Sequence, residues 1–270
     1  MNIDTGTNEL LCSVRDGVAL ITLNRPEARN AMSENLTPAL RRQIKERADD
    51  PAVGAILITG AGTAFCSGGD VKSMAGRAPR TQLGFEARLA DLRWRQAHLT
   101  GALVATRKPT IAALPGAAAG AGLALALACD IRIAAKSAFV STGYVRVGLS
   151  GDYGIAWLLT RAVGSARARE LMFTGERVDA ERCERIGLVN RVVDDALLHE
   201  EAFELARSLA QGPQVALRNI KDNLDDALHV DYATALHREA ERLVQSSHTA
   251  DHKEAVAAFV EKRKPAFKGA

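Results

Sequence analysis

Two glycine-containing stretches combine residue types that can bring backbone amides close to a ligand. The first, AFCSGGD at residues 64–70, follows an apolar run that ends at Gly60. Consecutive glycines permit a tight or left-handed path, which can point backbone N–H groups at a ligand oxygen. The same pattern is also typical of an ordinary surface turn, so a ligand-binding loop is one of two interpretations.

The second stretch, PGAAAGAGLALALACD at residues 115–130, follows a predicted strand and begins a predicted helix. A helix start offers unpaired N–H groups and the positive end of the helix dipole, and small residues let a ligand approach that backbone. Gly116, Gly120 and Gly122 do not fit the dinucleotide-binding pattern G-x-G-x-x-G. Close packing of the helix against a neighbouring element is the alternative explanation.

Side chains that could transfer a proton are fewer. Asp152 lies between glycines in GLSGDYG, before a predicted helix, and is suited either to N-capping that helix or to acting as a base or nucleophile. Tyr144 carries a phenol, which with an ordinary pKa of about 10 is a poor base at neutral pH. His98 is a weaker candidate, because a half-buried or surface role explains a single histidine better. Trp94 and Trp157 are expected in the core or in a pocket wall.

Composition argues against several classes of protein. The 270-residue chain has a formal net charge of +3, too small to predict nucleic-acid binding. Its four cysteines show no metal-type spacing, which fits a reducing compartment and predicts no metal site. The uncharged stretch 111–129 is long enough for a membrane span, but Pro115 and several glycines interrupt it. Because the opening MNIDTGTNEL is polar, we expect a cytoplasmic protein that binds neither membrane nor nucleic acid.

The elements that must position these residues form an α/β pattern. Segment 9–24 predicts two strands joined by an Asp16-Gly17 hairpin turn. The helix that follows has Ser33 or Thr37 as a candidate N-cap. Further strands are predicted at 52–60, 110–114, 130–135 and 188–193, a long helix at 85–107, and mainly helices after Tyr153.

The remaining segments complete the predicted organisation. Residues 61–70 are expected to form a loop, 73–89 a lid-like segment, and 138–148 an extension of the sheet. A shift in composition separates a sheet-containing core, 1–195, from a helical C-terminal region, 196–270. The apolar faces of that helical region exceed what one chain would cover, which predicts self-association.

Four segments, in order, resemble the enoyl-CoA hydratase/isomerase (crotonase) family: NRPEARNAM, AFCSGGDVK, KPTIAALPGAAAGAGLALALACDIRIAA and GERVDAERCERIGLVNRVV. The likeness runs from about residue 10 to the C-terminal AAFVEKRKPAF. The resemblance implies a spiral of ββα units followed by a helical trimerisation region, assembled as a homotrimer or a dimer of trimers. It also implies an acyl-CoA thioester substrate, with coenzyme A as part of that substrate and no other tightly bound cofactor.

In this family two backbone N–H groups hold the thioester oxygen, and by resemblance they fall at Gly69 and Ala121. Such donors stabilise an enolate-like oxyanion, and each lowers the barrier by about 3 kcal/mol. Arg25 and Lys262 are each either a phosphate partner of the nucleotide or a surface charge. The resemblance further implies a coenzyme A site formed by Ala28, Gly69, Asp70, Val71, Lys72 and Ala121.

The chain departs from the family's hydratases at both catalytic glutamates. It has Ala124 and Tyr144 where these would lie, so the usual apparatus for activating a water is missing. Asp152 matches the place of a working aspartate in family isomerases and aryl-CoA dehalogenases, and AWLLTRAVG is similar to isomerases of the phenylacetate pathway. We therefore predict an isomerase that shifts a double bond with one carboxylate. The alternatives are a hydratase with atypical residues, a dehalogenase or hydrolase with Asp152 as nucleophile, and a non-catalytic acyl-CoA-binding protein.

Overall fold

The computed structural model describes residues 1–70 and 84–269. Within them, the larger of two sheets has seven strands in the order β1-β2-β3-β4-β6-β8-β11. Its first three strands are antiparallel, and the strands from β3 to β11 are parallel. The strands are Asn2–Ile3 (β1), Leu10–Arg15 (β2), Val18–Leu23 (β3), Ala55–Gly60 (β4), Thr110–Leu114 (β6), Ile131–Ala135 (β8) and Arg191–Val193 (β11).

The predicted hairpin is confirmed between β2 and β3. Asp16 and Gly17 both have positive φ, 52° and 77°, as a two-residue turn that matches the strand twist requires. Every residue of β4 and β6 is buried, which explains why these strands lack an alternating polar face.

A second, smaller sheet lies beside the first and has four strands in the order β10-β9-β7-β5 among the described residues. Strands β4, β6 and β8 of the larger sheet are each followed by a short strand of the smaller one. Helices then return the chain to the larger sheet, so the units repeat as a spiral of ββα steps. The strands are Ala64–Cys66 (β5), Ala117–Ala119 (β7), Phe139–Ser141 (β9) and Val178–Asp179 (β10).

Two sequence predictions were wrong around this smaller sheet. Segment 61–70 is not all loop, because β5 pairs with β7, and β7 itself precedes the helix in the small-residue stretch. Segment 138–148 does not extend the larger sheet: β9 joins the smaller one, and Tyr144–Val147 forms a 3-10 helix. These strands have only two or three residues, too few for an alternation to be visible in the sequence.

Helices cover the sheets and connect them. Neither predicted N-cap residue occupies that position in α1, which is taken by Asn35 without a side-chain cap, although Ser33 Oγ accepts the Leu36 N–H over 2.9 Å. The helix predicted at 85–107 is divided into two, and Gly164 interrupts α6 with a non-helical φ of 78°. The helices up to this point are Leu36–Asp49 (α1), Phe85–Ala97 (α3), Thr100–Ala105 (α4), Ala121–Leu127 (α5), Ile155–Thr174 (α6) and Ala180–Arg185 (α7).

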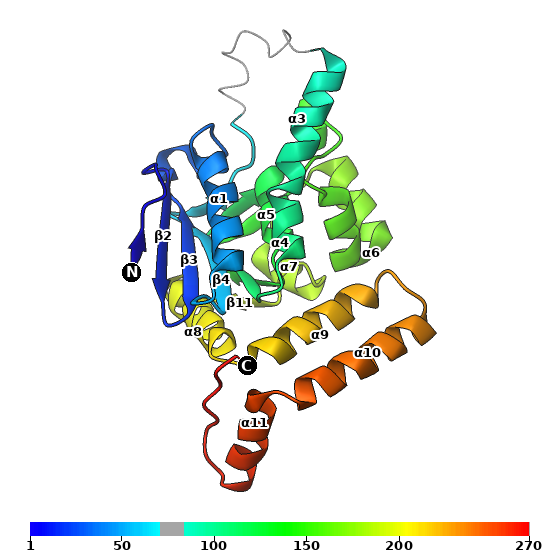
Figure 1. Cartoon of the computed structure of the whole chain (residues 1–270). Coiled ribbons are helices and arrows are strands. Elements are labelled where there is room, and N and C mark those ends of the chain that lie inside the picture. Colours follow the sequence, from blue (N-terminus) through cyan, green and yellow to red (C-terminus); the bar gives the residue numbers. More distant parts are fainter. Residues whose placement is uncertain (71–83, 270) are drawn as a thin grey trace.

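The C-terminal region is helical, as predicted. Figure 1 shows α8 against the sheet, where it contacts β3, β4, β6 and β8, whereas α9, α10 and α11 extend away from it. Ion pairs from Arg107 to Asp222 and Asp225 and from Lys221 to Asp130 tie α9 to the core. These helices are Leu198–Ala210 (α8), Gln214–Asp226 (α9), Tyr232–Ser247 (α10) and Ala250–Val260 (α11). The division at residue 195 stays a prediction.

The uncharged stretch 111–129 is folded into β6, β7 and α5 and the turns between them. Among the described residues, no helix has the length and apolarity needed to cross a membrane. Of the predicted lid-like segment 73–89, residues 73–83 lie outside the described part of the chain, and residues 85–89 belong to α3.

Candidate active site

Two backbone segments meet between the sheets, the loop after β5 and the start of α5. A Cβ atom on Gly68, whose φ is +90°, would lie 2.7 Å from Ala119 O and 3.3 Å from Ala121 N. Neither the Gly69 N–H nor the Ala121 N–H donates a hydrogen bond to any residue that the structure describes. The arrangement therefore places two candidate amide donors on adjoining segments.

Small residues in α5 also serve packing. A Cβ atom on Gly122 would lie 2.2 Å from Cys66 O and 2.7 Å from Cys66 Cβ, so only glycine lets α5 approach β5 this closely. Ala124, in the same helix, is fully buried. The packing interpretation is thus correct for Gly122, and it is compatible with a binding role for the amide at Ala121.

A carboxylate and a phenol lie beside this helix start. Tyr144 Oη donates a hydrogen bond to Asp152 Oδ1 over 2.6 Å. A Cβ atom on Gly120 would come within 3.9 Å of Tyr144 Cζ, the ring carbon that carries the hydroxyl. Because Gly120 directly precedes Ala121, the pair adjoins the proposed amide donor.

The surroundings of this pair determine which of the two groups, the Tyr144 phenol or the Asp152 carboxylate, carries the shared proton. Burial raises the pKa of Asp152, and the hydrogen bond from Tyr144 offsets that rise only in part. Burial and the neighbouring carboxylate raise the pKa of Tyr144 well above its ordinary value, so the phenol stays protonated and donates. Asp152 can therefore act as a base of increased strength, whereas Tyr144 cannot.

The N-cap interpretation of Asp152 is wrong. Helix α6 begins at Ile155, and Gly154 occupies the N-cap position without a side-chain cap. The Asp152 side chain accepts from Tyr144 instead. Its loop has positive φ at Gly151, Tyr153 and Gly154, of 123°, 51° and 75°. Left-handed backbone at a residue such as Tyr153 costs energy and is found more often at functional sites.

The other predicted site residues are distributed around the two segments. Ala28 adjoins the loop after β5, because Ser67 Oγ donates to Ala28 O over 3.4 Å. Arg25 forms ion pairs with Glu9 and Asp70. The coenzyme A candidates Val71 and Lys72 lie outside the described residues, and Lys262 is exposed in the chain after α11.

His98 is exposed and stacks on Trp94, with ring centroids 4.4 Å apart. Its Nδ1 lies 2.7 Å from Trp94 O, so the structure gives it a partner of its own on α3 rather than Asp152. Trp94 and Trp157 are not core residues, because they are 54% and 41% exposed. Trp157 instead stacks with the ring of His229 and with the guanidinium of Arg161.

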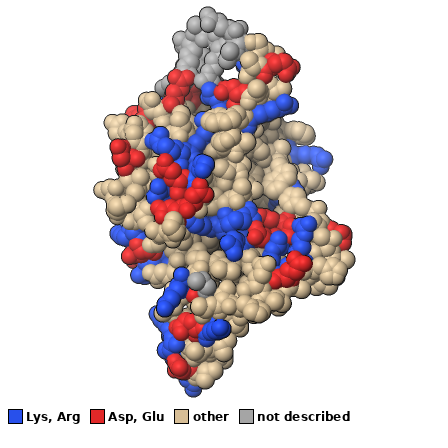
Figure 2. Space-filling model, in the orientation of Figure 1, with Lys and Arg blue, Asp and Glu red and all other residues tan. Residues whose placement is uncertain are grey.

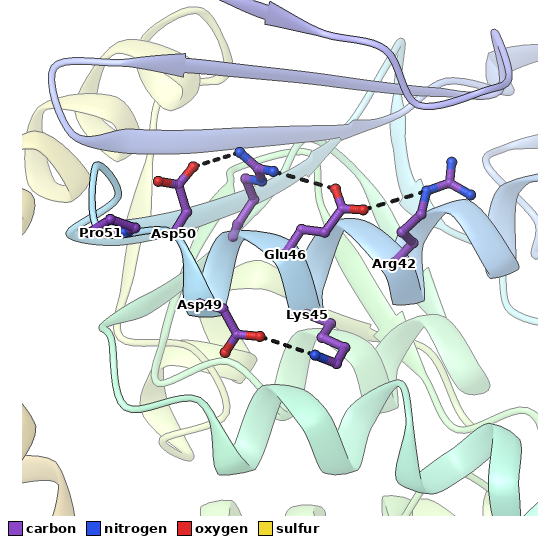
Figure 3. Close-up of a pocket in the computed structure, with 7 residues that line it drawn as sticks. Arg42, Lys45, Glu46, Asp49, Asp50 and Pro51 are labelled. Carbon is purple, nitrogen blue, oxygen red and sulfur yellow. Dashed lines mark hydrogen bonds and ion pairs between the residues drawn. The ribbon is translucent and has the colours of Figure 1, made fainter.

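An open pocket elsewhere carries charged residues at the C-terminal half of α1. Figure 3 shows its lining side chains paired with one another, as Lys45 is with Asp49. Arg47 also forms an ion pair with Asp50. Positive and negative side chains are interspersed over this face of the molecule as well (Figure 2). Since its charges neutralise each other, we assign this pocket no ligand. Its lining residues are Arg42, Lys45, Glu46, Arg47, Asp49, Asp50 and Pro51.

Comparisons with known proteins identify the family. A family model described as enoyl-CoA hydratase/isomerase matches residues 13–270. The chain is 38% identical over 265 residues to the "Probable enoyl-CoA hydratase echA8" of Mycobacterium bovis, covering 97% of this chain and 98% of that protein. It is also 38% identical over 266 residues to the 1,2-epoxyphenylacetyl-CoA isomerase of Escherichia coli, covering 96% of this chain and 98% of that protein.

Solved structures agree. The crystal structure of an enoyl-CoA hydratase from Polaromonas sp. JS666 matches with a TM-score of 0.88 and 32% identity, covering 96% of this chain and 99% of that chain. An enoyl-CoA hydratase from Bacillus anthracis matches with a TM-score of 0.87 and 32% identity, covering 97% and 100%. The predicted crotonase-type α/β fold is confirmed, and the chain belongs to the enoyl-CoA hydratase/isomerase family.

Proposed function

We propose that this protein is an enoyl-CoA isomerase, which moves the double bond of an unsaturated acyl-CoA. The observation that carries the proposal is the Asp152–Tyr144 pair beside the start of α5. By the resemblance to the family's hydratases, Ala124 and Tyr144 occupy the two positions of the catalytic glutamates, and Asp152 is the carboxylate that the described residues place beside Tyr144. The Escherichia coli relative named as an isomerase supports the same choice.

The reaction needs one base and a site for negative charge. Asp152 removes a proton from the carbon next to the thioester carbonyl, and the electrons of that C–H bond form a dienolate. The amides of Gly69 and Ala121 hold the dienolate oxygen, where each donor lowers the barrier by about 3 kcal/mol. Protonated Asp152 then returns the proton two carbons away, which leaves the double bond conjugated with the thioester. The raised pKa of Asp152 brings its basicity closer to that needed near neutral pH.

The substrate's coenzyme A is proposed to lie along the loop after β5. Gly69, Asp70 and Ala28 are at or beside this loop, and Ala121 faces it from α5. Since coenzyme A arrives and leaves with the acyl group, the mechanism uses no separate resident cofactor.

We also propose that the chain assembles as a homotrimer or a dimer of trimers. Helices α9, α10 and α11 leave large apolar side chains in solvent, which a single chain would bury if it could. The most exposed include Leu224, Leu243, Phe259 and Val260, at 65%, 69%, 86% and 74%.

The isomerase proposal is tested with a panel of β,γ- and α,β-unsaturated acyl-CoAs, both aliphatic and aromatic. Asp152→Asn keeps the size and the acceptor oxygen for Tyr144 but removes the base. We expect it to slow isomerisation by at least about a hundredfold, the lower end for general-base catalysis, with affinity for the CoA ester little changed. Tyr144→Phe is the matched control and should lose far less.

Other outcomes identify other chemistries. An active Asp152→Asn together with an inactive Tyr144→Phe would overturn the assignment of the base. An ester between Asp152 and the acyl group would indicate nucleophilic chemistry. Tight binding without turnover of any acyl chain would indicate a binding protein, and a β-hydroxyacyl-CoA product would indicate a hydratase.

A further inference from the structure

We propose that Arg25 is the positioning residue of the loop that carries the Gly69 amide. Its guanidinium connects this loop to the N-terminal part of the chain and pairs with the carboxylate of Asp70, the residue that follows Gly69. This inference rests on the proposed role of Gly69 in holding that oxygen.

Arg25 joins three separate parts of the chain. Its Nη2 lies 3.6 Å from Asp70 Oδ2, directly after Gly69 in sequence, and its Nε lies 3.4 Å from Glu9 Oε2. Its Nη1 donates to Ala31 O over 2.7 Å. The Arg25 side chain is only 17% exposed, so these contacts are shielded from most solvent.

The segment that Arg25 begins is itself bonded to the loop. Met32 N–H donates to Gly68 O over 2.8 Å, and Met32 and Gly69 form a parallel bridge. Ser67 N–H donates to Arg29 O over 3.0 Å. Backbone hydrogen bonds thus connect the loop to residues 29–32. Arg25 contacts both parts, since it donates to Ala31 O in this segment and forms an ion pair with Asp70 in the loop.

Buried Asn30 strengthens the same connection. Its Oδ1 accepts the Arg25 N–H over 2.8 Å, and its Nδ2 donates to Ala64 O over 2.7 Å, at the first residue of β5. The backbone of Arg25 is therefore fixed relative to β5. A displaced guanidinium would leave the strand and these backbone bonds in place and would remove only the contacts to Ala31, Glu9 and Asp70, so the effect is a small displacement of the loop that follows β5.

Charge gives Arg25 a second effect. Asp70 directly follows Gly69 in sequence, and the negative charge of its carboxylate opposes the build-up of a second negative charge on an oxygen held by the Gly69 amide. The positive charge of Arg25 opposes this repulsion. Glu9 remains ionised on the other side of Arg25: burial acts to raise its pKa, but hydrogen bonds from Ser33 and Asn35 and the charge of Arg25 bring it below its ordinary value.

These contacts distinguish a positioning role from phosphate binding. The Arg25 guanidinium donates to Ala31 O and forms ion pairs with Glu9 and Asp70, so two carboxylates already oppose the positive charge that a phosphate would need. Phosphate binding predicts that loss of Arg25 weakens binding of coenzyme A itself. Positioning predicts that this loss weakens polarisation of the thioester carbonyl.

The test uses Arg25→Gln with two readouts besides turnover. The first is the red shift in the absorption of a bound aromatic α,β-unsaturated CoA thioester, which reports carbonyl polarisation without any reaction. The second is the affinity for free coenzyme A by calorimetry. We expect a smaller red shift, a kcat lower by about a hundredfold, as for a displacement of about 1 Å, and an affinity for coenzyme A within about twofold of the parent's.

Asp70→Asn and the double variant complete a mutant cycle. The double variant should have a kcat about tenfold higher than that of Arg25→Gln, because the Asp70 carboxylate no longer repels the oxyanion. Its kcat should stay below that of the parent, because the loop still lacks its contacts to Arg25. Arg25→Lys keeps the charge but cannot reach Asp70, Glu9 and Ala31 at once. Its red shift and its kcat should therefore lie between those of the parent and those of Arg25→Gln. It also provides the test if Arg25→Gln fails to fold by melting curve.

An unchanged red shift in Arg25→Gln, or in Arg25→Lys if that variant is the one that folds, overturns the proposal. A selective loss of affinity for coenzyme A also overturns it, in favour of a phosphate contact. If the parent itself gives no red shift, the amide donors assigned under the proposed function are wrong, which is a different failure.

Discussion

Replacing Tyr144 with phenylalanine removes the hydroxyl that donates to Asp152 Oδ1 over 2.6 Å and leaves the ring in place. A hydrogen bond to a charged group stabilises that group by about 1.5–3 kcal/mol. One pKa unit corresponds to about 1.4 kcal/mol, so losing the donor should move the titration of the carboxylate upward by about one to two pH units. Asp152 is only half-buried, and a water can replace part of the bond, so we expect the lower end, about one pH unit.

The assay is the pH dependence of kcat/KM for a β,γ-unsaturated acyl-CoA, from about pH 5 to about pH 9. Only the ionised carboxylate accepts a proton, so the parent should lose activity as the pH falls through the raised pKa of Asp152. In Tyr144→Phe this acid limb should move about one pH unit higher, while the alkaline plateau changes little. An acid limb that does not move, or an equal loss at every pH, would refute the reasoning.

Further predictions concern stability and assembly. Folding raises the pKa of Asp152, so the parent loses stability relative to Asp152→Asn as the pH rises through that pKa. The melting temperature of Asp152→Asn should therefore exceed that of the parent at about pH 8. The two melting temperatures should become equal below about pH 4, where the carboxyl is protonated in both the folded and the unfolded state. Gly122→Ala places a Cβ atom 2.2 Å from Cys66 O and should lower the free energy of unfolding, measured in urea, by about 1–3 kcal/mol. Gly84→Ala is the control, because a Cβ atom there would meet nothing within 4 Å. Equal urea midpoints for the two variants would contradict the packing account. Light scattering at micromolar concentration should give three or six times the 28.8 kDa chain mass, and a monomer would disprove the assembly.

The elements predicted well are those with a strong local signal. The Asp16-Gly17 turn needs two residues with positive φ, a requirement visible in the sequence. The buried strands β4 and β6 appear as apolar runs. The three-residue strands β5 and β7 gave no such signal, because their pairing depends on contacts between segments far apart in the chain.

The site was predictable only in part. Resemblance indicated Gly69, Ala121 and Asp152 as separate positions. The hydrogen bond between Tyr144 and Asp152 could not be predicted, because it depends on the path of the loop through Gly151 and Tyr153, both with positive φ. Tyr153 gives no sequence signal for such a conformation, which is uncommon for a bulky residue. The same loop geometry explains why Asp152 does not cap α6, although its type and place favoured a cap.

The most direct test of the central claim is to identify the product that the parent protein forms from a β,γ-unsaturated acyl-CoA in deuterated water, by NMR. If Asp152 shuttles a proton across a dienolate held by the Gly69 and Ala121 amides, the product is the conjugated α,β-unsaturated isomer. Deuterium then enters the γ-carbon to the extent that Asp152 exchanges its proton with solvent, and Asp152→Asn forms the isomer at least about a hundredfold more slowly. A β-hydroxyacyl-CoA as the main product, or an isomer formed as fast by Asp152→Asn, would contradict the account.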